Sequence, residues 1–272
     1  MPTPRPLRIH DARRRLRWEI WIVLGLSLLP SAAYALLSLL ETLAGPTPIA
    51  ETTQAINPAV SAFPLFDVLN RLVVFVARLM PVALVIWLLW SHRESGFRRL
   101  GFDLRSPGRD LGRGLLLAAA IGIPGLALYA VSRLAGATAQ VVTADSELAW
   151  WTAMLYVLAA LRAALIEEVI VVGYLVTRLR QLGWGWWPII LTSALVRGSY
   201  HLYQGVPMAL GNVAMGILFA AFFVWWSRPR SGGADARPAR RRVMPLVIAH
   251  FLLDLVAFLG YPLAVTLWPG VF

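Results

Sequence analysis

Long apolar stretches separated by short polar ones dominate the hydrophobic pattern of this 272-residue chain. Several of them exceed the roughly 18 residues that an α-helix needs to cross the ~30 Å core of a bilayer. The spanning helices that the pattern predicts are Trp18–Leu40, Leu65–Trp90, Leu115–Leu134, Leu148–Thr177, Trp187–Tyr203, Met208–Trp226 and Val243–Gly260. The expected fold class is therefore an all-α polytopic membrane protein, a bundle of about seven transmembrane helices, or eight if residues 261–272 add another.

Composition agrees with a membrane protein. Hydrophobic residues make up 58% of the chain and charged residues only 14%, whereas soluble domains carry roughly a quarter charged residues. No polar block is long enough to fold alone. We therefore expect one transmembrane domain over residues 18–260, between a basic cytoplasmic N-terminal tail (1–17) and a C-terminal tail (261–272).

The net charge of +11 comes from 25 basic side chains, all arginine. They concentrate at Arg5–Arg17, Arg93–Arg113 and Arg228–Arg242. Basic clusters next to spanning segments mark cytoplasmic loops, so the pattern predicts a multi-pass protein of the cell membrane with a cytoplasmic N-terminus. The expected partner of these clusters is the lipid bilayer and not nucleic acid. The chain has no cysteine, which excludes disulfides and thiol catalysis.

Ionisable residues inside spanning segments are costly and are therefore candidates for function. The predicted spans contain Arg71, Arg78, Arg162, Glu167, Glu168, Arg197, His201, His250 and Asp254. A helix rise of about 1.5 Å per residue gives depths from the cytoplasmic ends of about 16 Å for Glu167, 12 Å for His250, 18 Å for Asp254, 21 Å for His201 and 15 Å for Arg197. Three helices thus place acidic and imidazole groups in one slab near the midplane.

Two of these helices carry their polar residues in pairs. Arg197 with His201, and His250 with Asp254, are spaced i,i+4, so each pair is expected on one helix face. The two adjacent glutamates differ by about 100° around the helix axis. One of them is expected to face the site while the other meets a neighbouring helix.

This set of residues suits the activation of water. A glutamate serves as general base, while the imidazoles polarise a carbonyl or hold a zinc ion together with the glutamate. The metal set would be Glu167, His201 and His250. Proton-coupled transport uses similar residues, but the sequence has no inverted repeat and no obvious pair of broken helices, which disfavours a transporter.

Three motifs carry a resemblance to a known family. "EEVIVVGYL" (167–175), "RGSYHLYQG" (197–205) and "HFLLD" (250–254) resemble the motifs of the CPBP group, the CAAX proteases and bacteriocin-processing enzymes, also called Abi proteins. The resemblance covers about residues 148–260. It implies an intramembrane CAAX-type endopeptidase, a metalloendopeptidase if zinc is held, that hydrolyses a peptide bond of a peptide or protein substrate near the membrane.

The resemblance also implies roles for individual residues. Glu167 would be the base that activates water, and Glu168 would support or orient it. His201 and His250 would hold the metal or stabilise the oxyanion. Asp254 stands where the family has Asn or Asp.

Two positions depart from the family pattern. An Arg usually follows the second Glu by four residues, where this chain has Val172, and a Phe usually stands four residues before the His, where it has Arg197. We hypothesise that the arginine has moved to Arg197 and still contacts a motif carboxylate, so that it lies within about 8 Å of a glutamate. The alternative is a chain that has drifted from proteolysis: a non-catalytic immunity or scaffold protein, or a proton-linked carrier.

The sixth predicted span contains the small-residue stretch "GNVAMG" (211–216). Small residues at this spacing allow two helices to pack closely. Asn212 within it is a supporting candidate, which either hydrogen-bonds into the site or joins two helices.

Overall fold

The computed structural model describes residues 9–143, 149–226 and 241–267. The chain starts with α1 (Ile9–Ser27) and α2 (Leu29–Ala44), which meet at an angle of 55°. The first predicted span is thus bent, because Pro30 in the first turn of α2 cannot donate a backbone hydrogen bond to α1. Residues 9–17 of the predicted tail belong to α1, and residues 1–8 lie outside the described residues.

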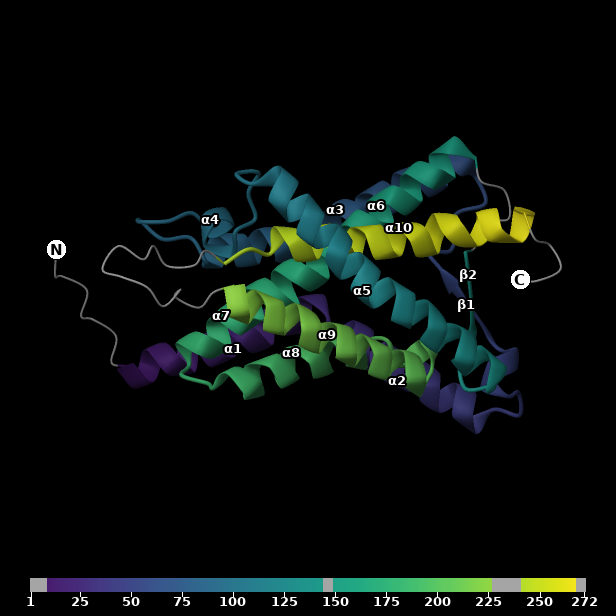
Figure 1. Ribbon diagram of the computed structural model, residues 1–272, viewed down its shortest axis with the longest axis horizontal. Coiled ribbons are helices and arrows are strands. Elements are labelled where there is room, and N and C mark those ends of the chain that lie inside the picture. Colours follow the sequence, from purple (N-terminus) through teal and green to yellow (C-terminus); the bar gives the residue numbers. More distant parts are fainter. Residues whose placement is uncertain (1–8, 144–148, 227–240, 268–272) are drawn as a thin grey trace.

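Three described helices can each cross a membrane by length and composition. They are α3 (Pro64–Leu88), α5 (Pro107–Leu134) and α9 (Val206–Trp226), and the bent α1–α2 pair adds a fourth span if its two helices cross as one. The chain is therefore a multi-pass membrane protein of mainly helical fold, as the sequence predicts, although the number seven is not established. Figure 1 shows α9 running mostly along the long axis of the molecule and α5 crossing the molecule obliquely.

The fourth predicted span is continuous but not uniform. It consists of α6 (Trp150–Ile166), the π-helix η2 (Glu167–Tyr174) and α7 (Leu175–Gln181). A π-helix leaves carbonyls with altered partners, and here Ser193 Oγ donates to the carbonyl of Val171 at 3.0 Å. All eight residues of η2 are buried, and it packs against α3, α8, α9 and α10. Such turns are frequent at functional sites.

Two of the last three predicted spans end elsewhere than expected, whereas α9 ends at Trp226 as predicted. Helix α8 (Trp186–Ser199) stops four residues before Tyr203, and the short 3₁₀ helix η3 (Leu202–Gln204) leads into α9. Helix α10 (Met244–Leu267) runs past Gly260, so residues 261–267 of the predicted tail are helical. Residues 268–272 and the basic stretch 227–240 lie outside the described residues.

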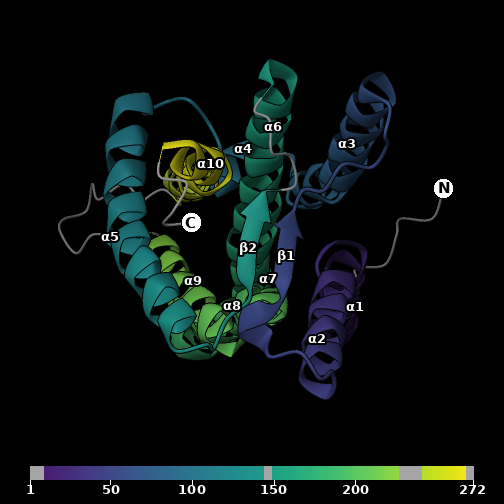
Figure 2. The same cartoon turned by 90° about the vertical axis from the view of Figure 1, so that its right-hand side faces the viewer.

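A two-stranded parallel ribbon is the feature that the sequence did not predict. Strand β1 (Thr53–Ile56), after the 3₁₀ turn η1 (Ile49–Glu51), pairs with β2 (Gln140–Thr143), with Thr53 opposite Gln140. Figure 2 shows the ribbon at one end of the helices. The fold is thus the predicted helical bundle with one small ribbon added.

At the other end of the helices, contacts with α4 and α5 fix the start of α10. The short helix α4 (Gly96–Leu100) ends at Gly101, whose positive φ of 62° suits glycine. The backbone N–H of Val243 donates to Leu100 O at 2.9 Å, and Arg242 forms a buried ion pair with Asp110 at the start of α5. These contacts set where α10 enters the bundle.

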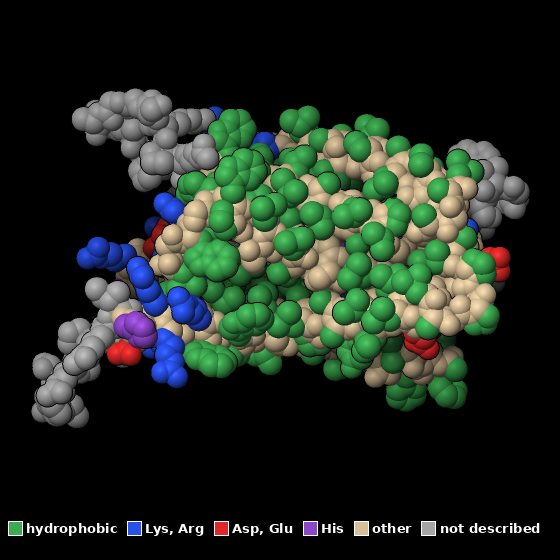
Figure 3. All heavy atoms as spheres, turned by 90° about the horizontal axis from the view of Figure 1, so that it is seen from below, with side chains coloured by type: hydrophobic (Ala, Val, Ile, Leu, Met, Phe, Trp, Pro, Cys, Tyr) green, Lys and Arg blue, Asp and Glu red, His purple; other side chains and the backbone are tan. Residues whose placement is uncertain are grey.

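The surface has the character expected of a protein in lipid. Large apolar side chains are exposed on the outer helices, for example Leu116 and Ile123 at 71% each. Figure 3 shows apolar side chains over much of one face and arginines gathered at the end where α1 begins, while acidic side chains lie at both ends.

Candidate active site

Glu167 and Glu168 stand at the first turn of the π-helix η2. Glu168 is fully buried, whereas the side chain of Glu167 keeps 12% of its surface exposed. The two carboxylates thus differ in their access to water, as the sequence predicts for adjacent residues with different neighbours. Only Glu167 is placed to meet a substrate or a water molecule from outside the packed core.

Arg197 on α8 contacts both carboxylates. Its Nη1 lies 3.1 Å from Glu167 Oε2, and its Nη2 donates to Glu168 Oε1. The predicted contact is confirmed, well within 8 Å. The guanidinium also stacks over the ring of Phe219, 5.4 Å from its centroid, and it is fully buried. Val172, where the family has its arginine, is fully buried in the hydrophobic core.

Tyr200 is a site residue that the sequence analysis missed. Its hydroxyl donates to Glu167 Oε2 at 2.9 Å, so this oxygen accepts from both the phenol and Arg197. The available signal was its position inside "RGSYHLYQG", next to His201. Among the described residues, the other oxygen of Glu167, Oε1, has no hydrogen-bond partner and remains the open acceptor.

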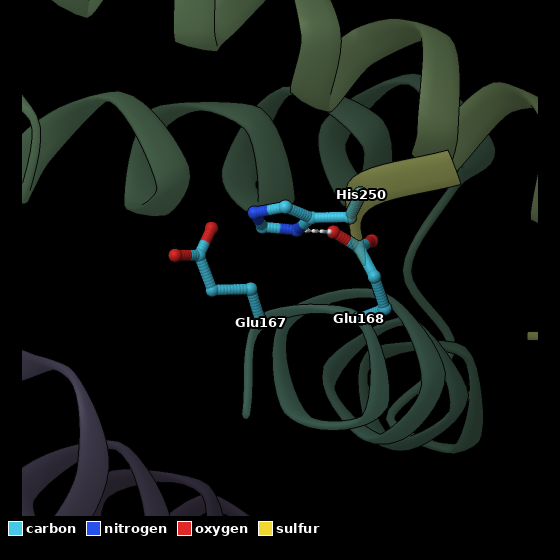
Figure 4. A group of neighbouring side chains, drawn as sticks. All are labelled: Glu167, Glu168 and His250. Carbon is cyan, nitrogen blue, oxygen red and sulfur yellow. Dashed lines mark hydrogen bonds and ion pairs between the residues drawn. The ribbon is translucent and has the colours of Figure 1, made fainter. Parts of the chain in front are cut away.

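His250 on α10 links the second glutamate to Asp254. Its Nδ1 lies 2.6 Å from Glu168 Oε1, and its Nε2 lies 3.5 Å from Asp254 Oδ2, one turn further along α10. The i,i+4 pair predicted from the sequence is therefore formed. Figure 4 shows the imidazole lying between the carboxylates of Glu167 and Glu168.

His201 lies beside this cluster rather than within it. Because α8 ends at Ser199, His201 follows the helix terminus and its Nδ1 bonds back to Arg197 O at 3.0 Å. A carbonyl only accepts, so Nδ1 carries a proton and Nε2 is the acceptor in the neutral ring. The ring packs on that of Tyr200 at 4.8 Å and interacts electrostatically with Glu167 and His250.

Asn212 does not reach the site. Its amide nitrogen donates to Met208 O at 3.0 Å on its own helix α9. The small residues around it do allow close packing: a Cβ on Gly216 would lie 2.8 Å from Ala194 Cα and 3.3 Å from Arg197 Cδ. We call the contact between Gly216 and Ala194 the α8–α9 seam. It lies beside the aliphatic part of the Arg197 side chain.

The residues that could hold a metal ion differ from the tentative set. Glu167, Glu168 and His250 offer ligand atoms that all lie within 4.8 Å of one another, and Glu168 Oε2 is buried without a hydrogen-bond partner among the described residues. Carboxylate and imidazole ligands suit zinc. His201 is outside this group, and Arg197 already supplies a positive charge to both carboxylates.

Comparison with known proteins adds one finding. Residues 149–256 match the model of the Rce1-like family, described as type II CAAX prenyl endopeptidase Rce1-like. The matched segment runs from the start of α6 into α10 and includes every residue of the site described above. No curated protein and no solved structure matches the chain significantly.

Proposed function

We propose that this chain, whose residues 149–256 match the model of the Rce1-like family of type II CAAX prenyl endopeptidases, is an intramembrane endopeptidase that uses Glu167 to activate water. The substrate is a peptide or protein at the membrane that ends in a CAAX-type sequence. The single observation that carries the proposal is the asymmetry of the glutamate pair. Glu168 is fully buried with its Oε1 held by both Arg197 and His250, whereas the Glu167 side chain keeps partial exposure and its Oε1 lies outside the contacts with Arg197 and Tyr200.

The reaction follows from this asymmetry. Glu167 Oε1 takes a proton from a water molecule, whose oxygen adds to the carbonyl carbon of the scissile peptide bond. The carbonyl oxygen becomes an oxyanion in the tetrahedral intermediate. As the C–N bond breaks, the protonated Glu167 returns its proton to the leaving amine, so protons and bonds balance.

The surrounding residues position the base. Tyr200 and Arg197 hold Glu167 Oε2 from two directions, at 2.9 and 3.1 Å, which aims Oε1 away from the packed core. Glu168 orients Arg197 and is itself held by His250. These fixed groups need no reorganisation during the reaction.

His201 is the group that we assign to the oxyanion. Its orientation is set by the bond from Nδ1 to Arg197 O, and its charge environment includes Glu167. In the neutral ring, whose proton is on Nδ1, Nε2 is an acceptor; a proton taken up during the reaction would turn Nε2 into a donor toward the negative oxygen of the intermediate. His250 and Asp254 support the cluster from α10.

A metal-dependent variant of this reaction is the second candidate, favoured by the approach of Glu167, Glu168 and His250 within 4.8 Å. Zinc held by these residues would polarise the water or the carbonyl. We favour the metal-free variant because the Arg197 guanidinium already contacts both carboxylates and places a positive charge between them.

The charge distribution supports an orientation. Arginines gather at the end where α1 begins (Figure 3), and basic ends face the cytoplasm. We therefore place the N-terminus in the cytoplasm, in the cell membrane, with the site reached from the basic end.

The test is cleavage of a prenylated CAAX-type peptide by the purified full chain. Glu167→Gln keeps an oxygen that can accept from Tyr200 and Arg197 but cannot take a proton, so product formation should fall by at least ~10²-fold while the protein stays folded. Equal product from both proteins would remove the proposed base and favour a non-catalytic membrane protein. A parallel reaction with a chelator, followed by added Zn²⁺, separates the two variants: unchanged rates support the metal-free one.

A further inference from the structure

The two adjacent glutamates contact one arginine, although an α-helix would direct them to different neighbours. Adjacent residues of an α-helix differ by about 100° around its axis, and the sequence predicts separate surroundings for Glu167 and Glu168 on this ground. In the structure Arg197 contacts both carboxylates. Figure 4 shows both glutamate side chains rising from one side of their turn toward His250. The local backbone must therefore differ from an α-helix in a way that brings the two carboxylates together.

The π-helix η2 provides this difference, because both glutamates belong to its first turn. In a π-helix each backbone N–H bonds to the carbonyl five residues earlier. Such a turn contains more residues than an α-helical turn, so a smaller angle separates neighbouring side chains. The wider turn thus brings both carboxylates to the side where one guanidinium reaches them. A group that stabilises the π-helix therefore also determines the geometry of the glutamate pair.

The end of the π-helix leaves one carbonyl of the described chain without an amide partner. The last bond of the π type runs from Leu175 N–H to Ile170 O, and bonds to the carbonyl four residues earlier resume in α7. The change from five residues to four skips one carbonyl, which is that of Val171. This residue is fully buried, and a buried carbonyl that accepts no hydrogen bond is destabilising. The π-helix is therefore stable only if another group donates to this carbonyl.

Ser193 on α8 is the donor. Its Oγ donates to Val171 O at 3.0 Å, and the serine is fully buried. A serine hydroxyl within a helix commonly bonds to a carbonyl of its own helix, as Ser199 Oγ does to Val196 O at 2.7 Å. Ser193 instead reaches across to the one carbonyl that the π-helix leaves open.

The same face of α8 holds both the backbone and the carboxylates of η2. Ser193 and Arg197 are spaced i,i+4, so they lie one above the other on α8. The residues that they contact, Val171 and Glu167, are also four positions apart, in the opposite order. Adjacent turns of α8 thus meet adjacent turns of the π-helix, with the two helices running in opposite directions. Ser193 fixes the wide turn, and Arg197 binds the carboxylates that this turn presents.

We propose that Ser193 is a positioning residue of the active site, which holds the π-helix and thereby keeps Glu167 and Glu168 directed at Arg197. This inference rests on the proposed endopeptidase function. The Ser193 hydroxyl bonds to a backbone carbonyl and takes no part in the proton transfers, so it acts through Glu167. Without the hydroxyl, η2 is free to shift toward the α-helical register, which turns the base away from Arg197.

The first experiment measures cleavage of a prenylated CAAX-type peptide by Ser193→Ala. We expect kcat to fall about 10- to 100-fold while KM changes by less than about twofold, because the base is misplaced and substrate binding is retained. Ser193→Cys has a similar volume but a weak donor, so its kcat should lie between those of wild type and Ser193→Ala. The matched control is Ser199→Ala, which removes a hydroxyl that bonds within α8 and should keep the wild-type kcat.

A double-mutant cycle tests whether Ser193 acts through the base. In a Glu167→Gln background Ser193→Ala should cause no further loss of cleavage, because no base remains to be positioned. The same fold-loss in both backgrounds overturns the proposal, and so does a wild-type kcat in Ser193→Ala. A loss shared by kcat and KM indicates a general structural role and also overturns it. Failure of the proposed function appears separately, as wild-type cleavage by Glu167→Gln alone.

Hydrogen exchange provides a measurement that needs no substrate. The backbone amides of residues 167–175 should exchange faster in Ser193→Ala than in wild type, and at the wild-type rate in Ser199→Ala. Unchanged exchange in Ser193→Ala overturns the claim that Ser193 holds the π-helix, whatever the cleavage rates are. If Ser193→Ala does not fold, Ser193→Cys takes its place in every comparison, with smaller effects in the same direction.

Discussion

Arg197 and Glu168 form an ion pair in which both side chains are fully buried, and this pair joins α8 to the π-helix η2. The same guanidinium contacts Glu167 at 3.1 Å. One arginine therefore compensates two adjacent acids that would otherwise share a low-dielectric environment. Removal of Arg197 leaves two buried carboxylates without their cation, a change that typically costs about 3–5 kcal/mol.

Arg197→Ala should abolish cleavage and lower the thermal stability of the detergent-purified protein. Val172 lies four residues after Glu168, so Arg197→Ala combined with Val172→Arg should recover part of both. Val172→Arg alone is the control, and it should destabilise the protein because it adds a second cation to a fully buried core position. A double variant no better than Arg197→Ala would show that the arginine must come from α8.

The two glutamates should respond differently to the same substitution. Glu168→Gln leaves Arg197 and His250 without their shared anion, so we expect about 3–5 kcal/mol of destabilisation. Glu167→Gln should lower kcat strongly with a much smaller change in the midpoint of thermal unfolding. Unfolding curves and cleavage rates for both variants provide the comparison, and equal loss of stability in the two would contradict the assigned division of roles.

Tyr200→Phe removes one hydroxyl and keeps the ring that packs on His201. Glu167 Oε2 then loses its 2.9 Å hydrogen bond, so the base is held by Arg197 alone. We expect kcat to fall about 10- to 100-fold with KM nearly unchanged, since the hydroxyl positions the base and does not bind substrate. Tyr203→Phe in the following turn offers a matched control that should retain most activity.

Gly216→Ala tests the α8–α9 seam. The added Cβ would lie 2.8 Å from Ala194 Cα, so α9 must move away from α8 and from the Arg197 side chain. We expect about 1–3 kcal/mol of destabilisation together with loss of activity. Gly112→Ala on α5, where a Cβ meets nothing within 4 Å, should be neutral or slightly stabilising; similar effects of the two would rule out the seam as the cause.

The sequence predicted the parts of the site that depend on regular helices. The pair His250–Asp254 followed from helix periodicity. The contact between Arg197 and the glutamates followed from the resemblance to the family, whose motif arginine is missing at Val172, together with a constant rise per residue. His201 lies outside the central group because α8 ends at Ser199. The predicted span continued the helix to Tyr203, and helical periodicity therefore gave a wrong position for the imidazole. Residues near a helix end are the least predictable by such a count.

The π-helix and the ribbon escaped prediction for another reason. Nothing local distinguishes "EEVIVVGY" from an ordinary apolar helix, and the wider turn is supported by a partner on another helix, Ser193, which donates to Val171 O. Strands β1 and β2 are four residues each and lie far apart in the sequence. Tyr200 was missed because a tyrosine beside a helix end resembles an interfacial aromatic residue.

The ribbon has a mechanical consequence for the site. Just before β2, the N–H of Ala139 donates to Gln204 O at 3.2 Å and the Thr138 hydroxyl bonds to the same carbonyl, three residues after His201. The turn that contains His201 is thus hydrogen-bonded to the segment before β2. Because β2 pairs with β1, this turn is connected to two loops that lie far apart in the sequence. A displacement of either loop would therefore move Gln204 and, with it, the nearby imidazole of His201. A ligand that binds to these loops could in this way change the position of His201 in the site.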